Sequence, residues 1–371
     1  MKYFLKSLLF FLTLVFRRLK VDVVFYYPQH FNRSEGLENA YFSDMINTCM
    51  QHNISFLVFE EPDFKTNFKR SKKSIPFDFL FLLIQVFRRC FFWQKNPIKK
   101  DQIIGRLFKK VLFERLRFKN VITISQSMVS FFRGFSPACN IYDVQHGIIH
   151  NNKANYIKNN KVEDNLTKND VHLLLSGQSF QDILIRHDKS SYFRSHSSVI
   201  GYGNDKPRKL YERFNHNALV TLQFTADHDE KTNKLLHQQL VDFISSNKNV
   251  NFYLKHHPRF NKELDLTTLF KLNNVHLASV NIRECFQQCS LNITAYSTSV
   301  FEAAFFGIPS ILINPLSRFN FFKDDFNYPL QYTINDFRDI RVYQESSQLL
   351  MDWAINFYTS YDENKFLNLL K

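Results

Sequence analysis

Short apolar runs rich in β-branched and aromatic residues alternate with longer amphipathic stretches along most of the chain. This alternation constrains the fold more than any other feature, because strands that take turns with helices form a parallel sheet covered on both faces. In the first half, the pattern predicts strands at residues 21–27, 54–59, 120–124, 140–144 and 171–175, with helices at 37–51, 77–93, 103–118, 126–134 and 176–187.

A second series of the same kind follows the small-residue segment from Gly201 to Pro207, which has the character of a linker. It predicts strands at 219–224, 251–255, 275–277, 291–294 and 308–313, with helices at 230–246, 282–288, 297–306, 345–358 and 362–370. A chain of 371 residues is long enough for two cores. The sequence therefore predicts two Rossmann-like α/β domains that face a cleft, at 21–205 and 206–371, preceded by an apolar and basic helix over 1–20.

Glycine and cysteine usage limits the kinds of phosphate-binding and metal-binding site that the chain can contain. The chain has only 8 glycines, so a phosphate group must be held by something other than a glycine-rich loop. Its 5 cysteines form no CxxC pair, and Cys285 and Cys289, four residues apart in a predicted helix, fit buried thiols better than a metal site. Nothing implies a disulfide framework, which favours a reducing compartment such as the cytoplasm.

The net charge of +14, from 48 Lys and Arg against 34 Asp and Glu, favours a polyanionic partner. Much of the positive charge stands beside Phe and Leu clusters in the first 120 residues, at 16–20, 86–89 and 107–110. Interfacial membrane helices have this composition. No sequence pattern of a nucleic-acid-binding module is visible, so the partner is expected to be an anionic membrane surface or a phosphorylated substrate, and not nucleic acid.

The apolar run at residues 3–16 leads directly into Arg17 and Arg18 and lacks a small-x-small cleavage site, which disfavours a signal peptide. At about 14 residues it is shorter than the roughly 20 needed to span a bilayer. The interfacial helix is the favoured interpretation, ahead of a buried core helix and a true span.

Residues 296–309 carry the first candidate site. Hydroxyl residues Ser297, Thr298 and Ser299 open a predicted helix after a strand, where backbone N–H groups and the helix dipole can bind phosphate. Glu302, one turn further along, is placed to accept hydrogen bonds from ribose hydroxyls. The same residues also fit an ordinary capped helix.

The second candidate is the run from Tyr253 to Arg259. A strand delivers Lys255, His256 and His257 to its carboxyl end, and the proline after them ends the strand. Because strand side chains alternate, one of the two histidines is expected to face a ligand, where a cation can neutralise a leaving phosphate. A structural role for the pair is the alternative.

Two further candidates lie in the first domain. Gly147 permits a sharp turn after the strand 140–144, and His146 before it is a suitable general base for a sugar hydroxyl. Glu35, in the loop after the first strand, could also act as base or bind an acceptor hydroxyl, although a helix-initiating role fits it better. No metal and no cofactor are expected, since the paired acids at 324–325 and 227–229 fit solvated loops.

Taken together, three motifs resemble those of a bacterial group of GT-B enzymes: Gln-His-Gly at 145–147, Lys-x-His-Pro at 255–258, and Ser-Thr-Ser at 297–299 followed by Glu-Ala and Gly-x-Pro. The group comprises capsule polysaccharide glycosyltransferases, bacterial polysialyl- and Kdo-transferases, and CDP-glycerol glycerophosphotransferases. The match covers residues 143–147 and 218–315, and the first 120 residues match nothing recognisable. The acidic pair before Gly of the polysialyltransferases is matched only at 34–36.

The resemblance implies donor-phosphate contacts at His257, Ser297, Thr298 and Ser299, a ribose contact at Glu302, and a catalytic base at His146. It implies an inverting, metal-independent glycosyltransferase, peripheral on the inner face of the cell membrane. The donor is a nucleotide sugar, CMP- or CDP-activated in preference to UDP or GDP, and the acceptor a bacterial surface polysaccharide or lipid-linked glycan. The alternatives are a CDP-alditol phosphotransferase on the same fold and a non-catalytic, membrane-associated binding protein of polysaccharide export.

Overall fold

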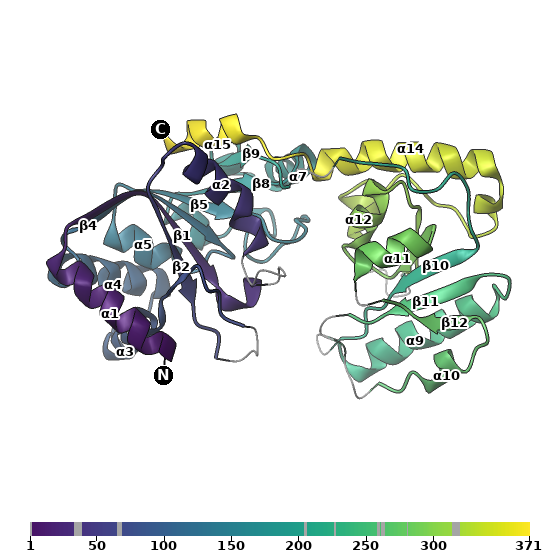
Figure 1. Cartoon of the computed structure of the whole chain (residues 1–371), viewed down its shortest axis with the longest axis horizontal. Coiled ribbons are helices and arrows are strands. Elements are labelled where there is room, and N and C mark those ends of the chain that lie inside the picture. The colour runs from purple at the N-terminus through teal and green to yellow at the C-terminus, as the bar shows by residue number, and fades with distance from the viewer. Residues whose placement is uncertain are drawn as a thin grey trace. The chain divides into compact units, whose positions relative to one another are not determined.

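The computed structural model describes residues 2–32, 39–64, 69–203, 206–225, 228–257, 260, 264–279, 281–313 and 320–371. The chain divides into two compact units (Figure 1). Unit 1 comprises residues 1–204 and 359–371, and unit 2 comprises residues 205–358.

Unit 1 is built on a seven-stranded parallel sheet with strand order β3-β2-β1-β4-β5-β8-β9. Its strands are β1 (Leu19–Pro28), β2 (Phe56–Glu61), β3 (Ile75–Pro76), β4 (Leu116–Ile124), β5 (Asn140–Val144), β8 (Val171–Leu175) and β9 (Ser197–Val199). A short antiparallel pair, β6 (Ile157–Lys158) and β7 (Lys161–Val162), stands apart from the sheet.

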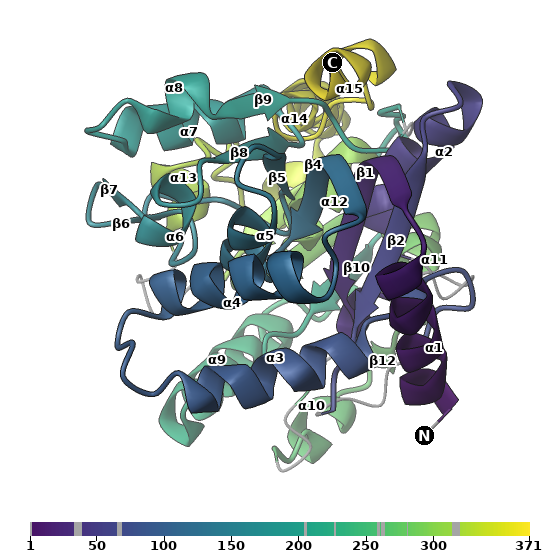
Figure 2. The ribbon, with the colours of Figure 1, turned by 90° about the vertical axis from the view of Figure 1, so that its left-hand side faces the viewer.

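Helices cover both faces of this sheet (Figure 2). They are α1 (Lys2–Phe16), α2 (Ser43–Gln51), α3 (Asp78–Cys90), α4 (Pro97–Val111), α5 (Val129–Phe135), α6 (Asp164–Thr167), α7 (Gln178–His187), α8 (Tyr192–Ser195) and α15 (Glu363–Leu370), with 3-10 turns at Gln29–Phe31 and Ala40–Phe42. Side chains of β1 alternate between the layers: Phe25 contacts Phe42 next to α2, whereas Tyr26 contacts Phe132 of α5. Burial on both faces explains why these strands are almost continuously apolar.

Unit 2 has a five-stranded parallel sheet in the order β12-β11-β10-β13-β14. The strands are β10 (Asn217–Thr221), β11 (Asn251–Lys255), β12 (Val275–Leu277), β13 (Leu291–Thr294) and β14 (Ser310–Leu312). The helices are α9 (Glu230–Ser245), α10 (Thr267–Phe270), α11 (Ile282–Gln288), α12 (Ser299–Phe305), α13 (Phe321–Asp324) and α14 (Ile340–Phe357), with a 3-10 turn at Asp336–Arg338.

These two parallel sheets confirm the predicted α/β class and the two Rossmann-like domains. Several predicted bounds, including those of β5, β8, β11 and α11, agree with the structure residue for residue. The predicted helix 103–118 was wrong at its end, because α4 ends at Val111 and β4 already begins at Leu116. Leu116 and Phe118 are buried while Arg117 and Lys119 are exposed, so the strand's period of two was hidden by the basic residues next to it.

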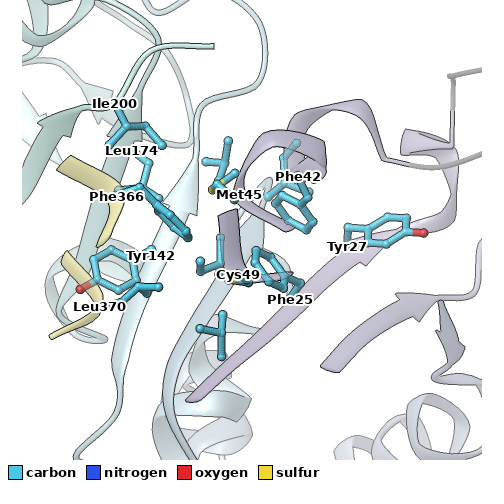
Figure 3. Close-up of a cluster of buried hydrophobic side chains, with 14 of the residues drawn as sticks. Phe25, Tyr27, Phe42, Met45, Cys49, Tyr142, Leu174, Ile200, Phe366 and Leu370 are labelled. Carbon is cyan, nitrogen blue, oxygen red and sulfur yellow. The ribbon is translucent and has the colours of Figure 1, made fainter. Parts of the chain in front are cut away.

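The last residues of the chain belong to unit 1 and not to the second domain, in which the sequence pattern placed them. Phe366 and Leu370 of α15 are buried in a cluster with residues of β1, β4, β5 and α2 (Figure 3). The backbone amide of Tyr202 donates to Thr359, and a Cβ on Gly201 would lie 2.1 Å from the carbonyl oxygen of Ser360. Apolar burial and this close backbone approach hold the tail on unit 1, which no local pattern could indicate.

One face of α1 packs onto unit 1 and the other stays exposed. Ser7, Phe11 and Leu14 are buried, and the ring of Phe11 stacks on Phe59 of β2 at 5.6 Å. The exposed face carries Leu5, Leu9, Leu12 and Phe16, which are 53%, 56%, 45% and 75% exposed. No helix in the described part of the chain has both the length and the apolar character needed to cross a bilayer.

Candidate functional site

In unit 2, strands β10, β11 and β13 end side by side at Thr221, Lys255 and Thr294. Ligands of open parallel sheets bind outside the carboxyl ends of the strands. The residues at and after the ends of β11 and β13 are those of the first two predicted sites. The structure therefore brings both predicted sites to one edge of one sheet.

A network of hydroxyl groups connects β10, β13 and α12 at this edge. Thr294 donates its Oγ1 hydrogen to the carbonyl of Thr221 at 3.0 Å and accepts the backbone amide of Ser297 at 3.3 Å. The hydroxyls of Thr221 and Ser299 lie 2.9 Å apart, and Ser299 is 3% exposed. The Ser299 hydroxyl thus makes a buried hydrogen bond within unit 2.

The helix α12 begins two residues later than predicted. Thr298 is its exposed N-cap residue and makes no side-chain capping hydrogen bond, whereas the Oγ of Ser297 accepts the amide of Ser299 at 3.2 Å. The loop 295–298 consequently presents the half-buried Ser297 and the exposed Thr298 next to the strand ends. Of the three hydroxyl residues predicted to bind the donor, these two remain exposed to solvent.

Lys255 and Glu302 are electrostatic neighbours. Glu302 is exposed on α12, but neighbouring protein atoms partly desolvate its carboxyl and raise its pKa, while the positive charges of Arg283 and Lys255 act in the opposite direction. The ammonium group of Lys255 also donates to the carbonyl of Ser279 at 3.2 Å. A cation and a carboxylate at the end of β11 and on α12 form a polar site suited to phosphate and hydroxyl groups.

The two adjacent histidines have different surroundings. The ring of His256 lies 4.3 Å from that of Phe260, and burial together with Lys255 lowers the pKa of His256. The carbonyl of His257 accepts the amide of Phe260 at 2.9 Å, which turns the loop directly after β11. Pro258 and Arg259, the rest of the predicted motif, lie outside the described residues.

His228 and Tyr296 add a pair that the sequence interpretation missed. The Tyr296 hydroxyl is hydrogen-bonded to His228, whose Nδ1 lies 3.3 Å from Oδ1 of Asn233. Both residues follow neighbouring strand ends, β10 and β13, so they belong to the same edge. The signal that could have found His228 is its position after a predicted strand, in a stretch interpreted only as loop acids.

In unit 1, the turn after β5 is held by Gln145. Its side-chain oxygen accepts the backbone amide of Ser176 at 3.0 Å and its nitrogen donates to the carbonyl of Gly147 at 2.9 Å. Gly147 has φ +72°, a conformation that confirms the predicted sharp turn. The turn places His146 at the carboxyl edge of the seven-stranded sheet.

His146 is half-buried, with its ring edge-to-face against Phe31 at 5.5 Å. Just before it, Asp143 is fully buried and accepts hydrogen bonds from the amide of Gln126 at 2.7 Å and the hydroxyl of Tyr156 at 3.4 Å. Burial raises the pKa of Asp143 to about 7. Glu35, the other predicted catalytic residue, lies outside the described residues.

A histidine–carboxylate pair at the same edge was also missed. His30 follows β1 and Asp63 follows β2, and Nδ1 of His30 lies 3.2 Å from a carboxylate oxygen of Asp63. The amide of Asp63 donates to the side-chain oxygen of Gln29 at 3.0 Å. Because the two strands are neighbours, the rule applied to His146 would have selected both residues.

Metal ligation finds no support in the described ranges, where no group of three or more His, Cys, Asp or Glu side chains could hold an ion. The acids at 324–325 do not lie in a solvated loop as predicted, because Asp324 ends the short helix α13 and Asp325 after it is buried.

No protein-family model matches the sequence, and no curated protein matches it. Solved structures do resemble it. S. aureus MnaA with UDP has a TM-score of 0.53 at 10% identity, over 95% of this chain and 96% of that one. UDP-GlcNAc 2-epimerase from Methanocaldococcus jannaschii gives 0.52 at 12% identity, over 95% and 99%. The wall teichoic acid polymerase TagF, as its H444N variant, gives 0.51 at 12% identity, over 99% and 92%. At these identities the likeness concerns the fold: the chain has the GT-B type of fold, with two Rossmann-like α/β domains.

Proposed function

We propose that this protein is a glycosyltransferase that moves a sugar, or a related group, from a nucleotide-activated donor to a bacterial surface polysaccharide or lipid-linked glycan. The observation that carries the proposal is the polar edge of unit 2: Lys255 ends β11, Ser297 and Thr298 follow β13, and Glu302 on α12 interacts electrostatically with Lys255. The fold shared with MnaA in complex with UDP and with the polymerase TagF supports it.

The donor roles follow from the chemistry of this edge. Lys255 supplies a cation for the leaving phosphate, with His257 in the loop beside it. Ser297 and Thr298 donate hydrogen bonds to phosphate oxygens, and Glu302 accepts from ribose hydroxyls. Ser299 has a weaker case as a phosphate ligand, since its hydroxyl is already hydrogen-bonded to Thr221. The Lys-x-His-Pro resemblance favours CMP- or CDP-activated donors over UDP and GDP.

The proposed reaction is inverting and uses no metal. His146 is the base that the family resemblance suggests for the acceptor hydroxyl, and the cationic side chains of unit 2 stabilise the nucleotide that leaves. The proposal assigns the donor to unit 2 and the acceptor to unit 1.

A thermal-shift panel with CMP, CDP, UDP and GDP tests the donor site, because a ligand that binds the folded state raises Tm. We expect a selective shift that is reduced in Lys255→Ala and Ser297→Ala and retained in Lys234→Ala, a control on the exposed surface of α9. A protein that none of the four nucleotides stabilises would contradict the donor assignment.

Product analysis then separates the activities. Release of free nucleotide with transfer to a glycan fits the proposal, and transfer of a phosphoalditol from CDP-glycerol identifies a phosphotransferase. Conversion of UDP-GlcNAc without nucleotide release identifies an epimerase instead. Binding without turnover fits a non-catalytic protein of polysaccharide export.

The proposed location is the cytoplasmic face of the cell membrane, with α1 and α3 of unit 1 against the lipid. Two features support it. The exposed leucines of α1 recur at helical spacing, and α3, which contacts α1, exposes Leu82 and Val86. Beyond α3, Phe92 and Trp93 are 78% and 64% exposed. A contiguous patch of exposed apolar side chains on a surface marks an interaction site.

Charge favours an anionic lipid surface as the partner. The exposed cations Lys2, Lys6, Arg17 and Arg18 lie on or directly after α1, and Arg89 ends the exposed side of α3. Each such cation contributes about 1 kcal/mol of attraction near an anionic leaflet. The apolar residues would enter the acyl boundary while these cations contact the headgroups.

A further inference from the structure

We propose that Asp143 and Tyr156 position His146 for its reaction with the acceptor hydroxyl, an inference that rests on the proposed glycosyl transfer with His146 as its base. Asp143 lies in β5, three residues before His146, and Tyr156 comes after the turn, directly before β6. All three residues belong to unit 1. Asp143 and Tyr156 act on the base through its backbone and are therefore positioning residues.

A chain of hydrogen bonds leads from the turn to the buried carboxyl. The backbone amide of His146 donates to the hydroxyl oxygen of Tyr156. This hydroxyl in turn donates to Oδ2 of Asp143 at 3.4 Å, and both side chains are fully buried. Burial and the negative charge of Asp143 raise the pKa of Tyr156 well above its usual value, so the phenol keeps the hydrogen that it donates.

The second oxygen of Asp143 fixes the neighbouring turn, which follows β4. Oδ1 accepts the backbone amide of Gln126 at 2.7 Å. The side chain of Gln126 donates to the carbonyl of Asn155 and accepts from Nδ2 of Asn165 at 3.1 Å. One carboxyl thus joins the turns that follow two adjacent strands, β4 and β5.

The turn after β4 has an unfavourable backbone conformation. Ser125, Gln126 and Met128 have φ values of +62°, +52° and +58°, in the left-handed region that residues other than glycine rarely adopt. Such residues persist only where the surrounding structure fixes them, and they cluster at functional sites. The hydrogen bond from Gln126 to Asp143 supplies one of these constraints.

Two other buried acids of unit 1, Glu60 and Asp78, share the guanidinium group of Arg70. Burial raises the pKa of Asp143 to about 7, and the groups that act against it are the neutral amide of Gln126 and the neutral hydroxyl of Tyr156. A buried charge compensated only by neutral groups costs stability. A turn that needed only a hydrogen-bond acceptor would be served better by a neutral residue.

The chemistry of a carboxylate gives a reason for this cost. Hydrogen bonds to an ionised oxygen are roughly twice as strong as those between neutral groups. Ionised Asp143 therefore holds the Gln126 amide and the Tyr156 hydroxyl more tightly than an amide side chain could. An acid of raised pKa at the carboxyl edge of a parallel sheet also has the character of a functional-site residue.

The test measures nucleotide release from CMP-sialic acid, CDP-glycerol, UDP-GlcNAc and GDP-mannose, with water as the acceptor. Tyr156→Phe removes the hydroxyl between His146 and Asp143. It should lower kcat roughly 10- to 100-fold, because a displacement of about 1 Å is enough to lose that factor. The KM for the donor and the Tm increment from the matching nucleotide should be unchanged, since the proposed donor site is in unit 2.

Tyr192→Phe is the matched control, because it also removes a phenol hydroxyl that is hydrogen-bonded within unit 1. The Tyr192 hydroxyl donates to the carbonyls of Leu166 and Val171 at 3.0 and 2.8 Å, at the amino end of β8. Its loss should lower Tm and leave kcat at the wild-type value. Losses of kcat in both variants that follow their losses of Tm would show that Tyr156 acts only on stability, and would overturn the inference.

A double-mutant cycle tests whether the two residues act through His146. Residues that act as a unit have non-additive effects on kcat. Tyr156→Phe should therefore not lower the residual kcat of His146→Gln any further. Asp143→Asn keeps an oxygen for the Gln126 amide but presents N–H groups to Tyr156, so it should follow the same pattern if Tyr156→Phe does not fold.

Hydrogen exchange of the His146 amide gives a readout that does not depend on turnover. Without the Tyr156 hydroxyl, this amide should exchange roughly two- to tenfold faster, the factor that corresponds to one net hydrogen bond. In Tyr192→Phe it should exchange at the wild-type rate.

Wild-type kcat in Tyr156→Phe, additive losses in the cycle, or an unchanged exchange rate of the His146 amide would overturn the inference while leaving glycosyl transfer intact. Absence of release by the wild-type protein from all four donors would overturn the proposed function, and the inference with it.

Discussion

The hydroxyl oxygens of Thr221 and Ser299 lie 2.9 Å apart, so that the end of β10 and the first residue of α12 share a buried hydrogen bond. The residues at this edge of the unit 2 sheet are therefore of two kinds. Some hold the edge together through buried hydrogen bonds, and others are exposed and can contact the donor. Ser299, although part of the hydroxyl motif, belongs to the first kind. Thr298, one residue earlier and exposed, belongs to the second.

Replacement of these two residues should therefore have opposite effects. Ser299→Ala leaves the buried Thr221 hydroxyl without this partner and should lower the free energy of unfolding by about 1–3 kcal/mol. The Tm increment produced by the nucleotide should stay the same. Thr298→Ala should leave stability within about 0.5 kcal/mol of the wild type, as for most surface changes, and reduce the nucleotide increment. Chemical denaturation and thermal shift measure both, and an exchange of the two phenotypes would show that Ser299 binds the donor.

The exposed face of α1 should govern binding to lipid vesicles. Leu9→Asp combined with Leu12→Asp should weaken binding to phosphatidylglycerol-containing vesicles roughly tenfold or more, because two leucines no longer enter the apolar layer. Leu349→Asp is the matched control, since Leu349 is 49% exposed on α14 of unit 2 and should leave binding unchanged. Sedimentation with anionic and with pure phosphatidylcholine vesicles gives the comparison. Equal binding to both vesicle types, or no effect of the double variant, would exclude the proposed surface.

The docked tail makes a prediction about stability. Phe366 is 1% exposed in the core cluster of unit 1, so Phe366→Ala should lower the free energy of unfolding of that unit by about 3–5 kcal/mol. Asn364→Ala, exposed on the same helix, should have little effect. Trp353 lies in unit 2, and in a Trp93→Phe background its fluorescence reports that unit alone. If Phe366→Ala lowered the free energy of unfolding of unit 2 as much as that of unit 1, the tail would not stabilise unit 1 in particular.

Asp143 should give unit 1 a pH-dependent stability. Its pKa rises to about 7 in the folded protein, so the unfolded state ionises first as pH rises. Stability is unaffected below the ordinary carboxyl pKa of about 4, falls between about pH 4 and 7, and is constant above that window. At about 1.4 kcal/mol per pKa unit, the loss amounts to as much as about 4 kcal/mol.

Asp143→Asn removes this titration and keeps an oxygen that can accept the amide of Gln126. Denaturation curves at pH 5 and pH 8 should show the variant gaining about 3 kcal/mol relative to the wild type between the two values. Parallel curves for the two proteins would mean that Asp143 does not titrate in this range.

Local patterns determined the elements and the general position of the sites. Strands of a parallel sheet covered on both faces are mostly apolar, so β5, β8, β11 and β13 were predicted from short runs rich in aliphatic and aromatic residues. The turn at Gly147 follows from the conformational freedom of one residue. Since ligands bind at the carboxyl ends of parallel strands, the position of Lys255, Ser297 and His146 at or just after the ends of predicted strands also located them at sheet edges.

Only the tertiary structure decided which side chains meet. His30 and Asp63 are 33 residues apart, and Thr221 and Ser299 are 78 apart, so the pairing of β1 with β2 and of β10 with β13 creates both contacts. The pattern of the tail fits one more helix of the second domain, but Phe366 and Leu370 are buried in the core cluster of unit 1. The hydrophobic periodicity of a segment shows which of its faces is apolar. It does not show which other segment covers that face, because apolar burial is not directional. For that reason the sequence determined the two α/β domains. Only the tertiary structure showed which residues at the carboxyl edge of each sheet hold that edge together and which are exposed to a ligand.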